Sequence, residues 1–344
     1  MNSGIRQGDG GVARYHHTDL ELNAPVSTEI TGYAVSALVY AYRRSGDTKY
    51  LDAALTSGQF LMDQAWDTTL RTFVFELHRN GHPLRSYFFD TGIIVRALLA
   101  LWRETHDDRH LDAAVRGGFA MREFVDGSVI HPIVDLPGKS PLPHQPSWSR
   151  SPGCYQLKSA MAWNDLFTAA GEAAFAVEYE RAVETALANE AAFLPDPGGP
   201  EKTMDRLHAY CYFLEGLLPI ADRPEASMAL RDGIGKVSSY LREIEPVFVR
   251  SDVYAQLVRL RLFAHPLAGV AVDEAAATEE ATRMNAYQSF ERDERRSGGF
   301  YFGRTGEALR PYVNPVSTAF CMQALELWAD YKAGELNADH TSLI

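Results

Sequence analysis

The sequence predicts an all-α protein, an (α/α)6-type toroid of about six helical hairpins, and three observations point to this fold class. The segment from Ile30 to Ala54 returns sixty residues later as the segment from Asp90 to Ala114. Apolar residues recur at three-and-four spacing in eleven segments, with almost no strand pattern. The segments alternate between nearly all-apolar and more charged ones, and helices that are apolar on every side are buried. These observations together predict a ring of inner helices surrounded by a ring of outer helices.

The repeat joins two helical patterns by a short polar turn. Such a unit cannot bury its own apolar face, so it indicates stacked hairpins. The residues with an identical partner sixty positions later are Thr31, Gly32, Val35, Ala37, Leu38, Arg43, Asp47, Leu51, Asp52, Ala53, Ala54 and Gly58.

The periodicity gives the expected helices in chain order, and the first, third and fifth are the most apolar. They span residues 28–44, 48–66, 91–105, 108–125, 155–170, 175–193, 207–220, 226–244, 253–264, 272–290 and 316–332. We expect one toroid domain over residues 25–334, after an extended segment (1–24) and before a tail (335–344). Long loops rich in Pro, Gly, His and aromatic residues precede the inner helices, a position typical of functional loops.

A second repeat links the two ends of the chain. The motif GGVARY at Gly10 leads to PVST at Pro25, and GGFYFG at Gly298 leads to PVST at Pro315. The first and last inner helices are therefore expected to begin with the same turn and, in a closed ring, to lie side by side.

The composition excludes several classes of partner. The hydrophobic fraction of 46% and charged fraction of 23% are those of a globular protein. A net charge of -12 without a basic stretch disfavours nucleic acid and anionic membranes. There is no signal-peptide or membrane-spanning pattern, and three distant cysteines indicate reduced thiols, so we expect a cytoplasmic protein. The oligomeric state stays open.

The alternating helix pairs, the TGY and DTG helix starts, the LDAA of the outer helices and the GGF-type loops resemble the six-hairpin glycosidase and polysaccharide-lyase group of (α/α)-toroids. The resemblance covers roughly residues 10–333 and is architectural, without a matching catalytic signature. It implies a toroid and a carbohydrate substrate. Terpene-cyclase and prenyltransferase toroids are disfavoured because no DxDD cluster is present.

Polar residues at the starts of the inner helices are the candidate catalytic groups, because these ends converge on one mouth if the helices run the same way. Glu29, Asp90 and Asp252 are candidate acids and bases, with Glu29 and Asp90 on adjacent inner helices. Asp90 and Asp252 also fit a purely structural role as helix N-caps.

The segment RLHAYCYFLEG supplies a second set of candidates. His208 and Tyr212 are four residues apart and share a helix face, with Arg206 nearby. Such groups can move a proton at a uronate carbon, although a buried core histidine is the alternative. His208 and Cys211 have zinc-ligand spacing, but no CxxC or HExxH accompanies them, so no metal and no cofactor are predicted.

The remaining candidates would position a sugar. Aromatic rings suit sugar faces as well as an ordinary core, and His78, Arg79 and His82 with Arg85 bring positive charge to a loop that is equally suited to plain solvation. The candidate substrate-binding residues are Arg85, Tyr155, Lys158, Trp163, Arg206, Tyr210, Tyr254, Gln256, Tyr301, Tyr312 and Asn314.

The sequence thus favours a glycoside hydrolase acting on an oligo- or polysaccharide. Two alternatives remain open: a uronate lyase or C5-epimerase that uses His208 and Tyr212, and a non-catalytic carbohydrate-binding or scaffold protein of a polysaccharide pathway.

Overall fold

The computed structural model describes residues 3–77 and 83–344, which form two compact units. The N-terminal unit holds residues 6–14 and 25–189, and the C-terminal unit holds residues 3–5, 15–24 and 190–344. The single toroid domain over residues 25–334 stays a prediction.

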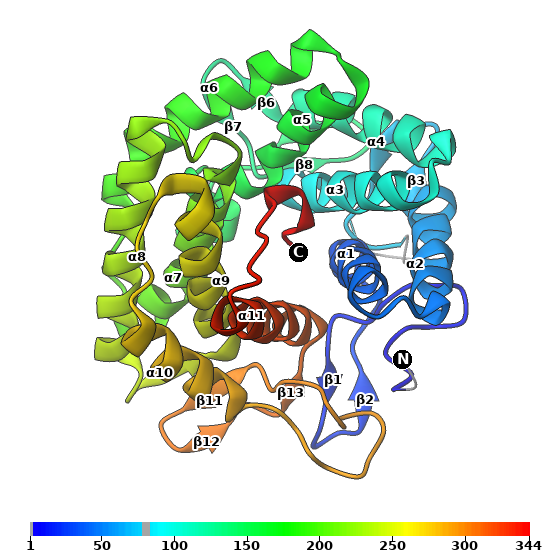
Figure 1. Cartoon of the computed structure of the whole chain (residues 1–344). Coiled ribbons are helices and arrows are strands. Elements are labelled where there is room, and N and C mark those ends of the chain that lie inside the picture. The colour runs from blue at the N-terminus through cyan, green and yellow to red at the C-terminus, as the bar shows by residue number, and fades with distance from the viewer. Residues whose placement is uncertain (1–2, 78–82) are drawn as a thin grey trace. The chain divides into compact units, whose positions relative to one another are not determined.

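The N-terminal unit consists of three helical hairpins (Figure 1). Its helix α3 packs against α1 and α5, and α2, α4 and α6 cover α1, α3 and α5 from the other side. The inner position of α3 agrees with its sequence, because Ile94, Leu98 and Leu99 are fully buried. The helices are α1 (Thr28–Ser45), α2 (Thr48–Phe60), α3 (Phe88–Thr105), α4 (Asp108–Met121), α5 (Leu157–Ala170) and α6 (Ala173–Asn189).

The sixty-residue repeat is visible in the starts of α1 and α3. The hydroxyl of Thr31 donates to the carbonyl of Ser27 at 2.7 Å, and that of Thr91 donates to the carbonyl of Tyr87 at 2.8 Å. The two inner helices therefore begin with the same local hydrogen bond.

Two repeated glycines allow the outer helices to lie close to the next hairpin. A Cβ on Gly58 of α2 would lie 2.4 Å from Leu101 Cδ1 of α3. The equivalent Cβ on Gly118 of α4 would lie 2.2 Å from Leu166 Cδ1 of α5. Both contacts are shorter than real Cβ contacts, so the repeat conserves the spacing between hairpins within this unit.

The C-terminal unit contains the other five helices of the described chain (Figure 1). Helix α9 is its centre, because it packs against α7, α8, α10 and α11. These helices are α7 (Pro200–Gly216), α8 (Pro224–Ile244), α9 (Ser251–Ala268), α10 (Glu274–Asn285) and α11 (Pro315–Ala333).

The first and last inner helices begin with the same turn, as the second repeat predicts. The backbone N–H of Val12 donates to Thr31 Oγ1 at 3.0 Å, and that of Phe300 donates to Thr318 Oγ1 at 2.9 Å. In both cases a glycine-rich segment is tied to a threonine one turn inside the helix.

The two PVST strings, however, do not occupy equivalent positions. Ser27, the third residue of the first string, is the N-cap of α1. In α11 the N-cap is Asn314, and Pro315 is already the first helical residue. The shared turn therefore consists of the glycine-rich segment and the threonine to which it is hydrogen-bonded. The two identical PVST strings do not indicate its position.

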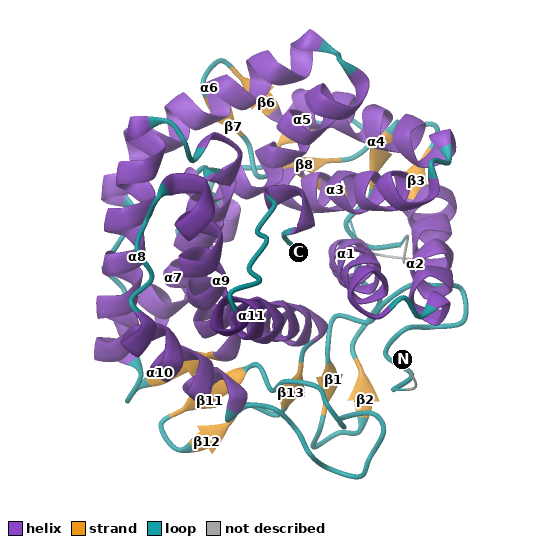
Figure 2. Ribbon diagram, viewed as in Figure 1, coloured by secondary structure: helices purple, strands orange, loops and turns teal. Residues whose placement is uncertain are grey.

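Short strands join the loops, where the sequence indicates almost none (Figure 2). Each has only two or three residues, too few to leave an alternating pattern. The N-terminal unit holds β3 (Trp66–Asp67), β4 (Thr72–Phe73), β5 (Arg85–Tyr87), β6 (Val125–Asp126), β7 (Val129–Ile130), β8 (Ile133–Asp135) and β9 (Ser140–Pro141). The C-terminal unit holds β1 (His16–His17), β2 (Leu22–Asn23), β10 (Phe248–Arg250), β11 (Gly303–Thr305), β12 (Ala308–Leu309) and β13 (Tyr312–Val313).

The pairing of β1 with β13 ties the beginning of the chain to the segment before its last helix. His16 pairs with Val313 and His17 with Tyr312 in antiparallel register. This contact lies within the C-terminal unit and explains why residues 15–24 belong to it.

Among the helix starts that differ from the expected ones, three bear on the candidate residues. Helix α3 begins at Phe88 and α9 at Ser251, so Asp90 and Asp252 lie within the first turn and neither is an N-cap. The N-cap residues, Tyr87 and Arg250, are the last residues of β5 and β10 and have extended backbones. Helix α7 begins at Pro200 instead of residue 207. It directly follows Gly199, which has a positive φ of 97°.

Candidate active site

Two carboxylates come together at the start of the inner helices of the N-terminal unit. Glu29 lies in the first turn of α1 and Asp90 in the first turn of α3, where the helix dipole favours acidic side chains. Asp90 is 6% exposed, and its Oδ2 is buried without a hydrogen-bond partner. An unpaired buried polar atom is costly, so this oxygen is suited to receive a ligand.

The surroundings of the pair favour the protonated forms. Burial raises the pKa of Glu29 to about 7, against the opposing charge of Arg14. Burial and the negative charge of Glu29 raise the pKa of Asp90 well above its usual range. Because the two groups influence each other, ionisation of one carboxyl group opposes ionisation of the other.

An ion pair and two stacked rings accompany the carboxylates. Arg14 Nη2, from the segment before α1, lies 2.7 Å from Glu76 Oε1, from the loop after β4. The Arg14 guanidinium lies over the ring of Phe75 at 5.1 Å, and Phe75 stacks on Tyr87 at 4.2 Å between ring centres. The charges of Arg14 and Glu76 both act on Asp90.

Tyr155 lies close enough to Asp90 for the two to interact electrostatically. Burial, followed by smaller effects of Cys154 and Asp90, raises the pKa of Tyr155. Its hydroxyl donates to the carbonyl of Ser151 at 3.1 Å, and its ring lies 5.1 Å from that of Trp148. Tyr155 thus belongs to the surroundings of the carboxylate pair.

The other predicted binding residues of this unit are placed differently. Trp163 is fully buried in α5, and its Nε1 donates to the carbonyl of Gly118 at 2.9 Å, so it is part of the interior. Lys158 is also fully buried on α5. Arg85 on β5 lies 3.8 Å from Asp135 on the paired strand β8. His78, Arg79 and His82 lie outside the described residues.

A second polar cluster occupies the C-terminal unit, between α7 and α9. His208 Nδ1 lies 2.7 Å from Gln256 Oε1 and 3.6 Å from Asp252 Oδ2. The rings of His208 and Tyr212 meet edge to face at 4.5 Å. His208 lies in the middle of α7, because that helix starts earlier than expected, but α9 brings Gln256 and Asp252 to it.

Hydrogen bonding determines the tautomer of His208. Gln256 Nε2 donates to the backbone carbonyl of His208 at 3.3 Å, which directs Gln256 Oε1 to accept from His208 Nδ1. The imidazole lone pair is then on Nε2. Burial and the charge of Arg250 lower the pKa of His208 to about 4, so the ring is neutral at pH 7.

Arg250 holds Asp252 as an ion pair. Its Nε and Nη2 lie 3.0 and 2.7 Å from the two Asp252 oxygens, and its Nη1 lies 2.9 Å from Asp205 Oδ1. Burial would raise the pKa of Asp252, but Arg250 and His208 lower it below its ordinary value. Asp252 is therefore a fixed anion, better suited to orienting His208 than to donating a proton.

Most of the remaining candidates make structural contacts. Arg206 Nη1 donates to the carbonyl of Phe193 at 2.9 Å, and the Tyr210 hydroxyl donates to Glu190 at 2.6 Å. Burial, with a smaller effect of Glu245, raises the pKa of Tyr254.

The last three candidates lie on or beside β13, the strand that pairs with β1. The Tyr301 hydroxyl donates to Glu291 at 2.7 Å, and Asn314 caps α11. The Tyr312 ring lies 4.9 Å from that of Tyr15 and 5.0 Å from that of His17, in edge contacts. We leave these residues out of the candidate site.

Sequence reasoning missed Arg14, Glu76, Arg250 and Asp205. None of them lies on an apolar helix at a position that periodicity singles out. The signal available for Arg14 was the repeated glycine-rich motif, because Arg14 is part of GGVARY. Arg250 lies two residues before Asp252, and this short spacing was the available signal for their ion pair.

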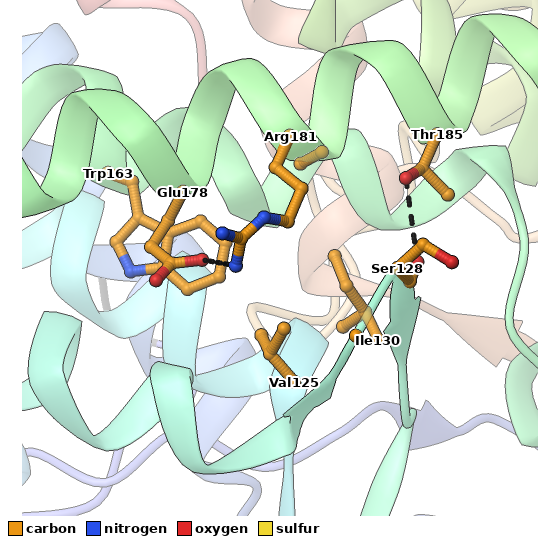
Figure 3. Close-up of a pocket in the computed structure, with 9 residues that line it drawn as sticks. Val125, Ser128, Ile130, Trp163, Glu178, Arg181 and Thr185 are labelled. Carbon is orange, nitrogen blue, oxygen red and sulfur yellow. Dashed lines mark hydrogen bonds and ion pairs between the residues drawn. The ribbon is translucent and has the colours of Figure 1, made fainter.

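A small pocket in the N-terminal unit lies away from these groups, between α6 and the β6–β7 hairpin (Figure 3). Arg181 contacts Glu178 at 3.2 Å beside Trp163, and Thr185 donates to the carbonyl of Ser128 at 3.4 Å. Its empty space of about 200 Å³ includes open solvent. This is less than the roughly 300 Å³ at which ordinary ligand sites begin.

Two kinds of feature are absent from the described part of the chain. No helix there is long and apolar enough to cross a membrane. The same residues contain no group of three or more His, Cys, Asp or Glu placed to hold a metal ion. The three cysteines are buried and free.

Comparison of sequences gives little. No family model matches the chain. An uncharacterized protein of Caenorhabditis elegans is 29% identical over 109 residues, and the match spans 30% of this chain and only 15% of that protein.

Comparison of structures decides the fold. A cellobiose 2-epimerase from Spirochaeta thermophila has a TM-score of 0.69 at 16% identity, over 95% of this chain and 93% of that one. A cellobiose 2-epimerase from Bacillus thermoamylovorans reaches 0.71 at 12% identity, over 93% of each chain. An unsaturated glucuronyl hydrolase variant reaches 0.62 at 14% identity, over 97% and 94%. The chain has the fold of the (α/α)6 toroids. The fold class and the architectural resemblance expected from the sequence are confirmed.

Proposed function

We propose that this protein is a carbohydrate-active enzyme, and that it hydrolyses a glycosidic bond with Glu29 and Asp90. The observation that carries the proposal is the interacting carboxylate pair, in which burial favours one shared proton. Glycoside hydrolysis needs two carboxyl groups in different protonation states. Sugar enzymes among the structural neighbours support the choice of substrate class.

In this proposal the two carboxyl groups have different roles. Asp90 is deeply buried and experiences the negative charge of Glu29, so it keeps its proton and donates it to the leaving oxygen. Glu29 has a pKa of about 7 and ionises more readily, so it activates water or attacks the anomeric carbon. The Phe75 and Tyr87 rings would support a sugar face.

The test is release of new reducing ends from a panel of neutral and acidic oligosaccharides. We expect Asp90→Asn and Glu29→Gln to lose at least about a hundredfold in kcat/KM while remaining folded. Asp52→Asn, a matched change at an exposed carboxylate on α2, should leave the rate unchanged. Rates close to wild type in both site variants would overturn the assignment.

A second candidate, epimerisation or elimination, is favoured by the His208 arrangement. A neutral imidazole with Nδ1–H bonded to Gln256 and the lone pair on Nε2 can abstract a proton from a carbon acid. In this case Asp252 and Arg250 position the histidine.

Proton NMR in D2O separates the two reactions. Deuterium incorporation into an intact sugar, abolished by His208→Asn and retained in Asp90→Asn, would favour epimerisation. An absorbing unsaturated uronate would indicate elimination. Sugar binding without any turnover by the wild-type protein would instead favour the scaffold role.

A further inference from the structure

Two histidines outside the candidate site face each other across a hairpin of the N-terminal unit. His131 lies two residues before the start of β8, and His144 lies three residues after the end of β9. His131 Nδ1 lies 3.2 Å from His144 Nε2, with ring centres 5.4 Å apart and planes inclined at 39°.

The strand register explains the approach. Val134 pairs with Pro141, and Leu142 N–H donates to the carbonyl of Ile133 at 3.1 Å. Continuing this antiparallel register by two residues places His131 opposite His144, where cross-strand side chains are neighbours. The His131 backbone is itself fixed, because its N–H donates to the carbonyl of Phe124 at 2.8 Å.

The two nitrogens lie at hydrogen-bond distance, and their separation of 3.2 Å is also close to that of two imidazole ligands on one metal ion, which would replace the proton between them. Imidazole nitrogens bind Zn²⁺ at about 2.0 to 2.1 Å, and in a tetrahedral site two of them lie roughly 3.3 Å apart. Imidazole also suits Cu²⁺ and Ni²⁺. His131 is partly exposed and His144 is exposed, so an ion can reach both from solvent.

We propose that His131 and His144 form a two-histidine site for a divalent late transition metal ion, Zn²⁺ or Cu²⁺. The described residues add no third His, Cys, Asp or Glu to this pair, so water completes the coordination. Two protein ligands imply moderate affinity, with Cu²⁺ binding more tightly than Zn²⁺.

A bound ion would join the two ends of the β8–β9 hairpin. Strand β8 pairs with β5, which leads directly into α3 and Asp90. The segment after His144 leads to Trp148 and Tyr155, whose rings are in contact. The site would therefore restrain the loop beside the carboxylate pair without contributing a group to it.

Isothermal titration of the full chain with Cu²⁺ and Zn²⁺, after removal of metal by a chelator, tests the proposal. We expect one site that is weakened by at least about tenfold in His131→Ala and in His144→Ala. His106→Asn is the matched control, because His106 is an exposed histidine whose left-handed backbone asparagine tolerates.

Electron paramagnetic resonance of the Cu²⁺ complex supplies an independent readout. Two nitrogen ligands are expected in the wild-type protein and one in each alanine variant, with circular dichroism confirming that the variants are folded. Equal affinity and identical spectra for the wild-type protein and both variants would overturn the proposal. So would loss of binding in His106→Asn alone.

Discussion

Arg14 and Glu76 form an ion pair at 2.7 Å whose two charges act in opposite directions on Asp90. Arg14 lowers the pKa of Asp90 and of Glu29, whereas Glu76 raises that of Asp90. Both residues come from segments without helical periodicity. The pair therefore adjusts the proposed acid and base from outside the inner helices.

Substitution of Arg14 and substitution of Glu76 should shift the pH dependence of kcat/KM in opposite directions. Arg14→Gln removes a positive charge that stabilises the ionised carboxyl groups, so the pKa of the proposed acid rises. The alkaline limb of the kcat/KM profile should therefore move up by about one pH unit. Glu76→Gln removes a negative charge near Asp90 and moves that limb down. Movement of both variants in the same direction would contradict these assignments.

The stability of the protein should depend on Glu29 in a pH-dependent way. Its pKa rises from 4.5 to about 7 on folding, so its favourable contribution is complete below 4.5 and is lost as pH rises through 7. Glu29→Gln should therefore gain free energy of unfolding relative to wild type between pH 5 and pH 8. Urea unfolding at several pH values checks this, and a difference that is constant with pH would contradict it.

Breaking the Arg250–Asp252 pair should destabilise the C-terminal unit. Asp252 and Arg250 are 2% and 8% exposed, and Asp252→Asn leaves the guanidinium with the carboxylate of Asp205 and the ring of Phe302. A loss of about 3 to 5 kcal/mol is expected at pH 7. Because the pKa of Asp252 is lowered, the loss should shrink as pH falls through that value.

The control for that variant is Lys332→Gln, which breaks the exposed Lys332–Glu274 pair of 3.0 Å. No measurable change in unfolding is expected for an ion pair on the surface. Equal effects of the two variants in denaturant titrations would show that burial of Arg250 and Asp252 is energetically unimportant.

Helices α3 and α5 approach each other at Gly92, two residues after Asp90. An added Cβ would lie 2.5 Å from Ser159 Cβ and 2.6 Å from Ser159 O. Gly92→Ala should cost about 1 to 3 kcal/mol of stability. Gly235→Ala on α8 meets nothing within 4 Å and should stabilise by about 0.4 to 1 kcal/mol. Thermal unfolding compares them, and equal midpoints would contradict the close approach.

Much of the helical layout is predictable from local sequence. The repeat places equivalent hydrogen bonds at Thr31 and Thr91, and its glycines mark the close contacts between hairpins. The start of α7 was predictable too, because Pro200 follows Gly199 and proline favours the first helical position. Apolar periodicity alone did not indicate this helix start, because the first turns of α7 are polar.

The site was predictable only in part. Glu29 and Asp90 stand out as acids on apolar inner helices, so their approach follows from adjacent hairpins. Arg14 and Glu76 act through a tertiary contact between extended segments, which no spacing encodes, whereas Arg250 lies only two residues before Asp252 and sequence reasoning overlooked it. Asp252 resembled a catalytic acid in sequence, and only the position of Arg250 reveals its ion pair.

The most direct test of the account is a titration of the Glu29 and Asp90 carboxyl groups by ¹³C NMR, in wild type and in Glu29→Gln and Asp90→Asn. The account predicts that Glu29 titrates near pH 7, that Asp90 titrates well above its usual range, and that removing the Glu29 charge lowers the pKa of Asp90. Two carboxyl groups that ionise independently near pH 4 would contradict a shared proton, and with it the proposed acid and base.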